Sequence, residues 1–430
     1  MKLLVKGGQV IDPANNRDDM LDILVEDGKI SKIGRNLKAR NAEILDAAGK
    51  IVCPGFIDIH AHLREPGFEY KEDLASGTRA AAAGGFTTVC CMPNTNPVID
   101  NMAVARFVRE RAKRTGVVNV LPIGSITKQQ AGEELSEYAD LIAAGCVALS
   151  DDGKPVSKAD VMRHALEYTR MFGVPVLSHC EDLSLSAQGQ MHEGFYSTYY
   201  GLKGIPAAAE EVMVARDIIL ARLTGGRLHI CHASTLGTMD LIRQAKAEGL
   251  NVTCEVTPHH LTLSDEIVGT YDADTKVMPP LRSQEHIEAL RAALLDGTID
   301  CIATDHAPHH LESKDCEYNL AAVGISGLET AVAVVMDQLV NRNLLTLNEM
   351  VRLFTCGPAD VMGLAKGRLN VGEAADITII DPHLSKTVDP QQFYSKGKNT
   401  PFKNMHLTGW PWATIVRGRL VYCDGSIIEE

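Results

Sequence analysis

Short apolar runs alternate with longer, mixed stretches through the middle of the chain. The runs contain little polar alternation, which is typical of parallel strands that are buried on both faces of a sheet. Eight such runs cover residues 55–62, 86–92, 118–123, 146–150, 174–178, 227–231, 251–256 and 300–303. Helical stretches between them cover residues 73–83, 102–113, 157–172, 208–223, 236–248 and 286–295. Eight strands that alternate with helices predict an α/β fold of the (β/α)8, TIM-barrel type.

Both ends of the chain have a different pattern, with short β-prone pieces separated by turn residues. Asp27-Gly28 and Asp424-Gly425 are turn signals of this kind. We therefore expect one small β-sandwich domain that is built from both termini. The predicted division is residues 1–53 and 367–430 for the β domain and residues 54–366 for the barrel.

Polar residues follow most of the eight apolar runs. In a barrel the carboxyl ends of all strands surround one mouth, where active sites lie. Side chains that are far apart in sequence therefore converge there. Any strand is expected to be followed by a polar residue, because it ends where the sequence becomes polar. This does not explain why four of the strand ends carry histidine and two carry aspartate. The residues are His60 and His62, Asn94, Asp151 and Asp152, His179, His232, His259 and His260, and Asp305.

Imidazole and carboxylate groups gathered at one mouth predict a metal centre. His60 and His62 are two residues apart, so both side chains point to the same side of a strand. Together with His179, His232, Asp305 and an aspartate of the fourth run they form a nitrogen and oxygen donor set that suits zinc or a similar divalent cation. Six donors exceed the need of one catalytic zinc, so we expect one or two cations, and a carboxylate that bridges a pair.

The bridging residue is either Asp151 or Asp152, because adjacent strand residues face opposite ways. Lys154 lies beyond the Asp-Asp-Gly turn and is expected in solvent. We interpret His259, His260, His306 and His310 as structural or rim residues, and Asp58 as a support for the histidine pair.

Charge and composition narrow the classes of function. The 430 residues carry a formal charge of -13, which disfavours nucleic acid and anionic membranes as partners. No apolar run reaches the length of about 18 residues that a membrane span needs. The 11 cysteines form no Cys-x-x-Cys pair and are expected as buried thiols in a reducing compartment. We therefore expect a cytoplasmic enzyme with a small-molecule substrate.

Several motifs together resemble the type I dihydroorotases, the long bacterial class within the amidohydrolase superfamily. They are Phe-Ile-Asp-Ile-His-Ala-His at 56–62, Arg-Glu-Pro-Gly at 64–67, Met-Pro-Asn-Thr-Asn-Pro at 92–97, Ser-Asp-Asp-Gly at 150–153 and Ala-Thr-Asp-His-Ala-Pro-His at 303–309. The resemblance extends over essentially the whole chain.

The resemblance implies a role for individual residues. His60 and His62 would hold a first metal, and His179 and His232 a second. Asp152 would bridge the two, where dihydropyrimidinases use a carboxylated lysine. Asp305 would contact the first metal and act as general base and acid. The implied substrate-binding positions are His62, Arg64, Asn94, Met278, His309, Val323 and Gly324.

Two of those positions depart from the family pattern. Met278 stands where an asparagine is usual, so a thioether replaces an amide that could hydrogen-bond the substrate. Val323 stands where many members have phenylalanine. Contacts made by the main chain survive a change of side chain, so these departures bear on affinity more than on the type of reaction.

The activity implied by the resemblance is the reversible cyclisation of N-carbamoyl-L-aspartate to dihydroorotate, the third step of de novo pyrimidine biosynthesis. Arg64 favours this substrate, because a guanidinium two residues after a metal-binding histidine can hold a substrate carboxylate. One alternative is another cyclic amidohydrolase, an allantoinase or a dihydropyrimidinase. Another is a non-catalytic scaffold for aspartate transcarbamoylase. The resemblance also implies a homodimer and a complex with that enzyme as further expectations.

Overall fold

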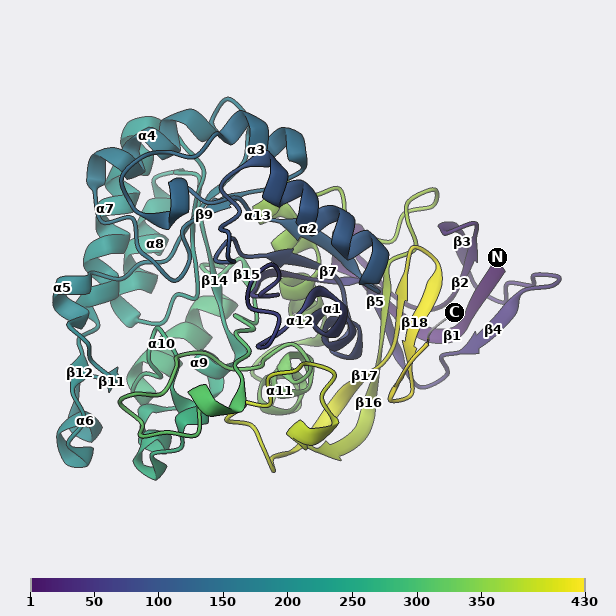
Figure 1. Cartoon of the computed structure of the whole chain (residues 1–430). Coiled ribbons are helices and arrows are strands. Elements are labelled where there is room, and N and C mark those ends of the chain that lie inside the picture. Colours follow the sequence, from purple (N-terminus) through teal and green to yellow (C-terminus); the bar gives the residue numbers. More distant parts are fainter. Residues whose placement is uncertain (1, 429–430) are drawn as a thin grey trace.

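Eight parallel strands form a closed ring, and helices lie around this part of the molecule (Figure 1). The computed structural model describes residues 2–428. The strands form a three-stranded sheet and a five-stranded sheet, which two parallel bridges join, Ala61 to His306 and Gly124 to Leu149. Each predicted run contains one strand, so the barrel is confirmed. The strands are β6 (Phe56–Ala61), β7 (Phe86–Cys91), β8 (Asn119–Pro122), β9 (Leu149–Ser150), β10 (Val176–Ser178), β13 (Leu228–Ile230), β14 (Val252–Val256) and β15 (Cys301–Ile302).

Helices surround the ring, and the starts of the first two follow from capping residues. Asp73 accepts a hydrogen bond from the Ser76 backbone at 2.8 Å, and Asn101 caps the second helix in the same way. The long helices are α1 (Leu74–Ala83), α2 (Met102–Thr115), α4 (Ala159–Thr169), α7 (Ala208–Thr224), α8 (Leu236–Ala247), α10 (Gln284–Leu295) and α12 (Leu347–Phe354). Shorter ones are α3 (Tyr138–Ala144), α5 (Leu183–Ser186), α6 (Phe195–Tyr200), α9 (Pro258–Thr262), α11 (Ala331–Val335) and α13 (Cys356–Met362).

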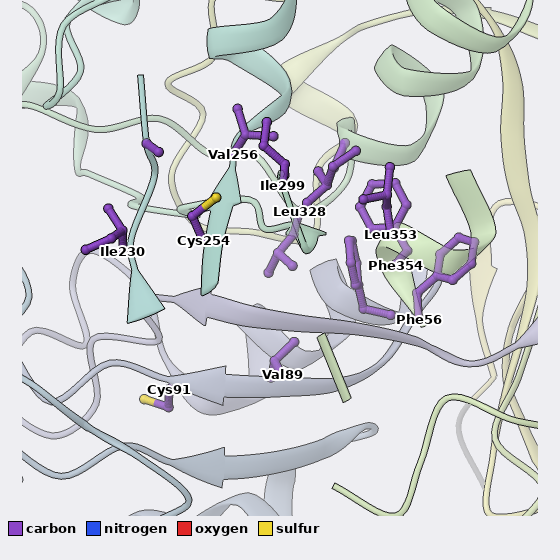
Figure 2. Packing of buried hydrophobic residues seen from close by; sticks show 14 of the residues in the cluster. Phe56, Val89, Cys91, Ile230, Cys254, Val256, Ile299, Leu328, Leu353 and Phe354 are labelled. Atoms are coloured by element: carbon purple, nitrogen blue, oxygen red, sulfur yellow. The ribbon is translucent and has the colours of Figure 1, made fainter. Parts of the chain in front are cut away.

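The main core lies between the strands and the helices, where the outward side chains of the barrel meet apolar helix faces (Figure 2). Phe56 at the start of β6 stacks on Phe354 of α12, with ring centroids 5.3 Å apart. Both rings are fully buried, and burial of such a side chain contributes about 1.5–3 kcal/mol. This packing holds β6, and therefore the histidines at its end, against the helical layer.

Both termini build a second unit, as predicted. Its nine strands are β1 (Lys2–Asp12), β2 (Arg17–Glu26), β3 (Lys29–Gly34), β4 (Glu43–Asp46), β5 (Ile51–Pro54), β16 (Ile377–Thr387), β17 (His406–Val416), β18 (Arg419–Cys423) and β19 (Ser426–Ile427). They form a single hydrogen-bonded sheet in which β16 pairs with β5 and so joins the two ends of the chain. Their inward side chains share one core.

Some features lie outside the predicted alternation. A short two-stranded sheet, β11 (Met191–His192) with β12 (Gly204–Ile205), carries α6 away from the barrel (Figure 1).

All 11 cysteines are free thiols, and nine of them are buried. Among residues 2–428, no helix combines the length and the hydropathy of a membrane span.

Candidate metal centre

The carboxyl ends of the barrel strands bring the six predicted metal-binding residues together. Their donor atoms form two neighbouring groups, and within each group the atoms lie within 4.8 Å of one another. All six side chains are buried. The first group is His60, His62 and Asp305, and the second is Asp152, His179 and His232.

Asp152 lies between the two groups. Its Oδ1 atom is 3.3 Å from His60 Nε2, 3.6 Å from His179 Nδ1 and 3.5 Å from His232 Nε2. Its Oδ2 atom faces the other way and is 3.4 Å from His62 Nε2. One carboxylate therefore presents an oxygen to each group.

The spacing of the donor atoms fits coordinated divalent cations. Ligand atoms about 2.0–2.1 Å from a tetrahedral cation are about 3.3–3.4 Å from each other. The separations around Asp152 agree with this, and Asp305 Oδ1 is 3.4 Å from His60 Nε2 and 3.1 Å from His62 Nε2. His60 Nε2 and Asp152 Oδ1 are buried without a hydrogen-bond partner. Buried polar atoms are normally paired, so this donor set suits a metal.

A second layer of residues orients the histidine rings. His60 Nδ1 lies 2.5 Å from Glu255 Oε1, His62 Nδ1 lies 2.9 Å from Asn94 Oδ1, and His179 Nε2 lies 3.2 Å from Glu181 Oε2. An oxygen acceptor on one ring nitrogen leaves the lone pair of the other nitrogen directed at the cluster. Three of the four histidines therefore present the nitrogen that a metal needs.

Electrostatic coupling within the cluster shifts several pKa values. Burial alone would lower the pKa of His60, but Asp152, Glu255 and Asp305 raise it well above its usual value. Hydrogen bonds to Asp152 and Glu181 likewise overcome burial and raise the pKa of His179 to about 10. Burial acts against ionisation of Asp305, yet His60 and His62 hold its pKa well below the usual range. The carboxylates are therefore charged at neutral pH.

The neighbouring candidates have other partners. Asp151 accepts hydrogen bonds from the backbone and the hydroxyl of Thr127, so Asp152 alone of the pair faces the histidines. Lys154 is exposed. His260 is held by Thr257 and by the Pro279 carbonyl, consistent with a structural role. His306 is fully buried against Glu72 rather than at the rim.

The backbone near the cluster is strained and tightly held. Arg64, His232 and Asp305 have positive φ angles of 61°, 33° and 47°. A residue other than glycine in this left-handed conformation costs about 1–2 kcal/mol. Strain of this kind is frequent at functional sites. Asp58 offsets part of it, since it accepts hydrogen bonds from the His60 backbone and from Thr304, which precedes Asp305.

Arg64 lies beside the cluster with an uncompensated charge. Its Nε–H group donates to the Pro308 carbonyl at 3.4 Å, and within residues 2–428 the guanidinium forms no ion pair. Burial lowers its pKa, and the charges of Asp305 and Asp152 act in the opposite direction. An anionic ligand at the mouth would supply the missing partner.

The other predicted substrate-binding residues lie around the same mouth. His309 Nε2 donates to the Val323 carbonyl at 2.9 Å, which leaves Nδ1 as a buried acceptor without a partner. Gly324 has φ 125°, and a Cβ there would lie 2.6 Å from the Cβ of Ala307, so the close approach requires glycine. Met278 is half-buried and lines a small cavity on the His179 side.

Glu255 and Asn399 are among the residues around the site that the sequence-based prediction did not include. Glu255 is a carboxylate inside an otherwise apolar strand, and that exception is a signal that could have identified it. Asn399 belongs to the C-terminal part of the chain. Its side chain accepts from the His309 backbone at 3.0 Å and donates to the Gly324 carbonyl at 2.9 Å. Only the fold brings Asn399 to the barrel mouth.

Comparison with known proteins agrees with this site. A family model described as dihydro-orotase-like matches residues 49–237, and a model of the amidohydrolase family matches residues 214–422. The dihydroorotase of Pelotomaculum thermopropionicum is 58% identical over 99% of this chain and 100% of its own length. The dihydroorotase of Pelobacter propionicus is 52% identical over 98% of this chain and 100% of its own length. That of Acetivibrio thermocellus is 51% identical over 97% of this chain and 98% of its own length.

Solved structures with the same architecture include hydantoinases. The L-hydantoinase (dihydropyrimidinase) of Arthrobacter aurescens superposes with a TM-score of 0.91 at 28% identity, over 100% of this chain and 97% of its own. A D-hydantoinase from Thermus sp. has a TM-score of 0.84 at 25% identity, over 100% and 97%. From the full-length identity to the dihydroorotases, together with both family models, the chain belongs to the dihydroorotase family of amidohydrolases.

Proposed function

We propose that this protein interconverts N-carbamoyl-L-aspartate and (S)-dihydroorotate, the ring-closing step of pyrimidine biosynthesis. The observation that carries the proposal is the position of Arg64, a half-buried guanidinium without an ion pair beside the six-residue cluster. Both forms of the substrate carry a carboxylate that this guanidinium can bind through two parallel hydrogen bonds. The relatives that are identical at more than half of their positions carry the name dihydroorotase.

Zinc is the metal that we propose, as one or two ions per chain. Histidine nitrogen with carboxylate oxygen is the donor set that catalytic zinc takes, and Asp152 would bridge a pair. When bound, divalent cations polarise an amide carbonyl and lower the pKa of water from 15.7 to about 7.

The protein side chains supply the proton transfer and the orientation. Asp305 is ionised, so it can accept a proton from water during ring opening and return it to the ring nitrogen that leaves. In ring closure the same carboxylate moves the proton in the opposite direction. We propose that Arg64 binds the substrate carboxylate while Asn94, His309 and the main chain at Val323 and Gly324 orient the ring.

A substrate panel tests this proposal, with two variants that should behave differently. Arg64→Met is expected to lower kcat/KM for carbamoyl aspartate by about a hundredfold, from the loss of charge-assisted hydrogen bonds of about 1.5–3 kcal/mol, and to leave hydrolysis of neutral dihydrouracil little changed. Asp305→Asn should abolish turnover of both substrates, because the proton acceptor is lost. Equal losses on both substrates in Arg64→Met would refute the carboxylate assignment.

A hydantoinase-type activity is the second candidate, since solved structures with this architecture include hydantoinases. Asp152 lies between the two groups, where the resemblance places a carboxylated lysine in dihydropyrimidinases, and Lys154 is exposed. Both observations favour dihydroorotase. The same panel decides, because faster turnover of hydantoin, allantoin or dihydrouracil than of dihydroorotate would support the rival.

We also propose a cytoplasmic homodimer that can associate with aspartate transcarbamoylase. A purely non-catalytic scaffold is disfavoured, because the donor set is complete. Sedimentation of the purified protein, alone and with that partner, measures both association states. A monomer that does not co-sediment with the partner would refute this part of the proposal.

A further inference from the structure

A second cavity lies at the opposite end of the barrel from the metal centre. Its volume is about 710 Å³, within the range of about 300–1,000 Å³ that is usual for small-molecule sites. It lies between the end of α2, the first residues of β8 and the turn that joins β17 to β18. The metal cluster lies at the carboxyl ends of the strands, so the two sites are separate.

The charge of this cavity contrasts with that of the whole chain. Seven of its 19 lining residues are arginine or lysine, and none of the described ones is aspartate or glutamate. The chain as a whole has a formal charge of -13. Like charges that lie close together repel one another unless an anion compensates them, so an anionic ligand would stabilise those cations of the cavity that form no ion pair.

Three of the cations are free to bind such a ligand. Arg114 and Arg417 are exposed and form no ion pair with the described residues, and Arg109 donates to the Ala144 carbonyl rather than to a carboxylate. Lys113 and Lys366 are already paired, with Glu110 and Asp376 at 2.6 Å each. Arg109, Arg114 and Arg417 come from both structural units, so one anion can contact the barrel and the β domain together.

Most of the remaining wall of the cavity is apolar, with Thr115 and Asn119 as the polar exceptions. Val117, Val120 and Leu121 of the barrel face it, together with Val421 and Ile428 of the β domain. Cations beside an apolar wall match a ligand in which a planar ring is joined to a charged chain. Arginine is also the residue that recognises phosphate through paired hydrogen bonds.

We propose that this cavity binds a nucleotide that carries two or more phosphates. The phosphates lie against Arg109, Arg114 and Arg417, and the base lies on the apolar wall. Bound in this place, the nucleotide links the barrel to the β domain at a distance from the catalytic mouth.

Calorimetric titration of the metal-loaded enzyme with ATP or UTP tests the proposal. Excess Mg²⁺ keeps the nucleotide from removing the enzyme's own metal, and saturating dihydroorotate fills the catalytic mouth. We expect saturable binding of one nucleotide per chain that persists with dihydroorotate present. Pyrophosphate and the free nucleoside should each bind more weakly than the nucleotide.

A pair of matched variants locates the site. Arg114→Gln with Arg417→Gln should weaken nucleotide binding at least about tenfold, since each lost charge-assisted hydrogen bond is worth about that factor or more. Arg106→Gln with Arg342→Gln removes two exposed charges outside the cavity, the first on the same helix, and should leave binding unchanged. Unaltered thermal unfolding and ring-closing activity show that both variants fold.

Three results would overturn the proposal: no saturable nucleotide binding, equal loss of binding in the two double variants, or displacement of the nucleotide by dihydroorotate.

Discussion

At the scale of single residues, the metal centre depends on partners that hold each ring as much as on the donors themselves. His60 is placed by the strand, but its orientation comes from Glu255, and that of His62 comes from Asn94. These contacts restrict each ring to one useful rotamer and one tautomer. Residues in this second layer are therefore expected to affect metal affinity without contacting the metal.

Glu255→Gln tests that expectation. The substitution keeps the shape of the side chain but removes the charge that stabilises the His60 ring, so metal affinity should fall about 10–100-fold. The measurement is competition with a chromogenic chelator. Asp151→Asn is the matched control, because its carboxylate binds Thr127 and not a histidine, and its metal affinity should be unchanged. An unchanged affinity in Glu255→Gln would contradict the assignment.

The pH dependence of metal binding follows from the raised pKa values of the histidines. His60 and His179 hold protons at neutral pH in the absence of a cation, since the pKa of both is raised. A cation must displace these protons, so its affinity should rise with pH between 6 and 8, by up to about a hundredfold per pH unit for two protons. Chelator competition at several pH values measures the slope. A flat profile would show that the rings are already neutral.

At the scale of elements, the mouth of the barrel is completed by the C-terminal segment before β17. Asn399 connects two parts of the long segment between β15 and α11, the part that carries His309 and the part that carries Gly324. Ser326 adds to this connection through the backbone of Asn399 and Gly397. A residue from outside the barrel therefore fixes the two parts of this segment relative to each other.

Asn399→Ala should impair the substrate side and leave the metal side intact. Loss of its hydrogen bonds lets His309 and Gly324 shift, and a displacement of about 1 Å can lower kcat/KM by about a hundredfold. We expect a raised KM with normal metal content. Asn251→Ala, at an exposed position, serves as control. Loss of metal together with activity would indicate a general structural defect instead.

At the scale of the whole molecule, the barrel and the β domain share one core. The main apolar cluster contains Phe56 of the barrel together with Cys53, Ile380 and Tyr422 of the β domain. The Phe56 backbone also donates to Thr378 Oγ1 at 3.1 Å. Division of the chain at residues 53 and 366 therefore separates groups that are buried against each other.

Cooperative unfolding should follow from this shared core. Calorimetry of the full chain is expected to give one transition, and a fragment of residues 54–366 should fail to fold, because Phe56 and its neighbours would be exposed to water. Two separate transitions, or a folded fragment, would show that the predicted domains are independent.

The pattern of apolar runs was sufficient to predict the eight-stranded ring, because strands that are buried on both faces consist mostly of apolar residues. It was also sufficient to predict the clustering of His60, His62, His179, His232 and Asp305, since parallel strands in a ring end at one mouth. The choice of Asp152 over Asp151 came from family spacing, and the hydrogen bonds of Asp151 to Thr127 give it a physical reason.

Other features depended on tertiary structure. Asn399 binds His309, which is 90 residues away, and β5 pairs with β16. Neither contact has a local sequence signal, because the periodicity of apolar residues does not encode long-range hydrogen bonds. The basic cavity likewise exists only where α2 meets the β17–β18 turn. Local patterning thus determined which segments form strands and which residue types lie at their ends. Packing of distant segments decided the orientation of each functional group, since orientation depends on partners that only the folded chain brings near.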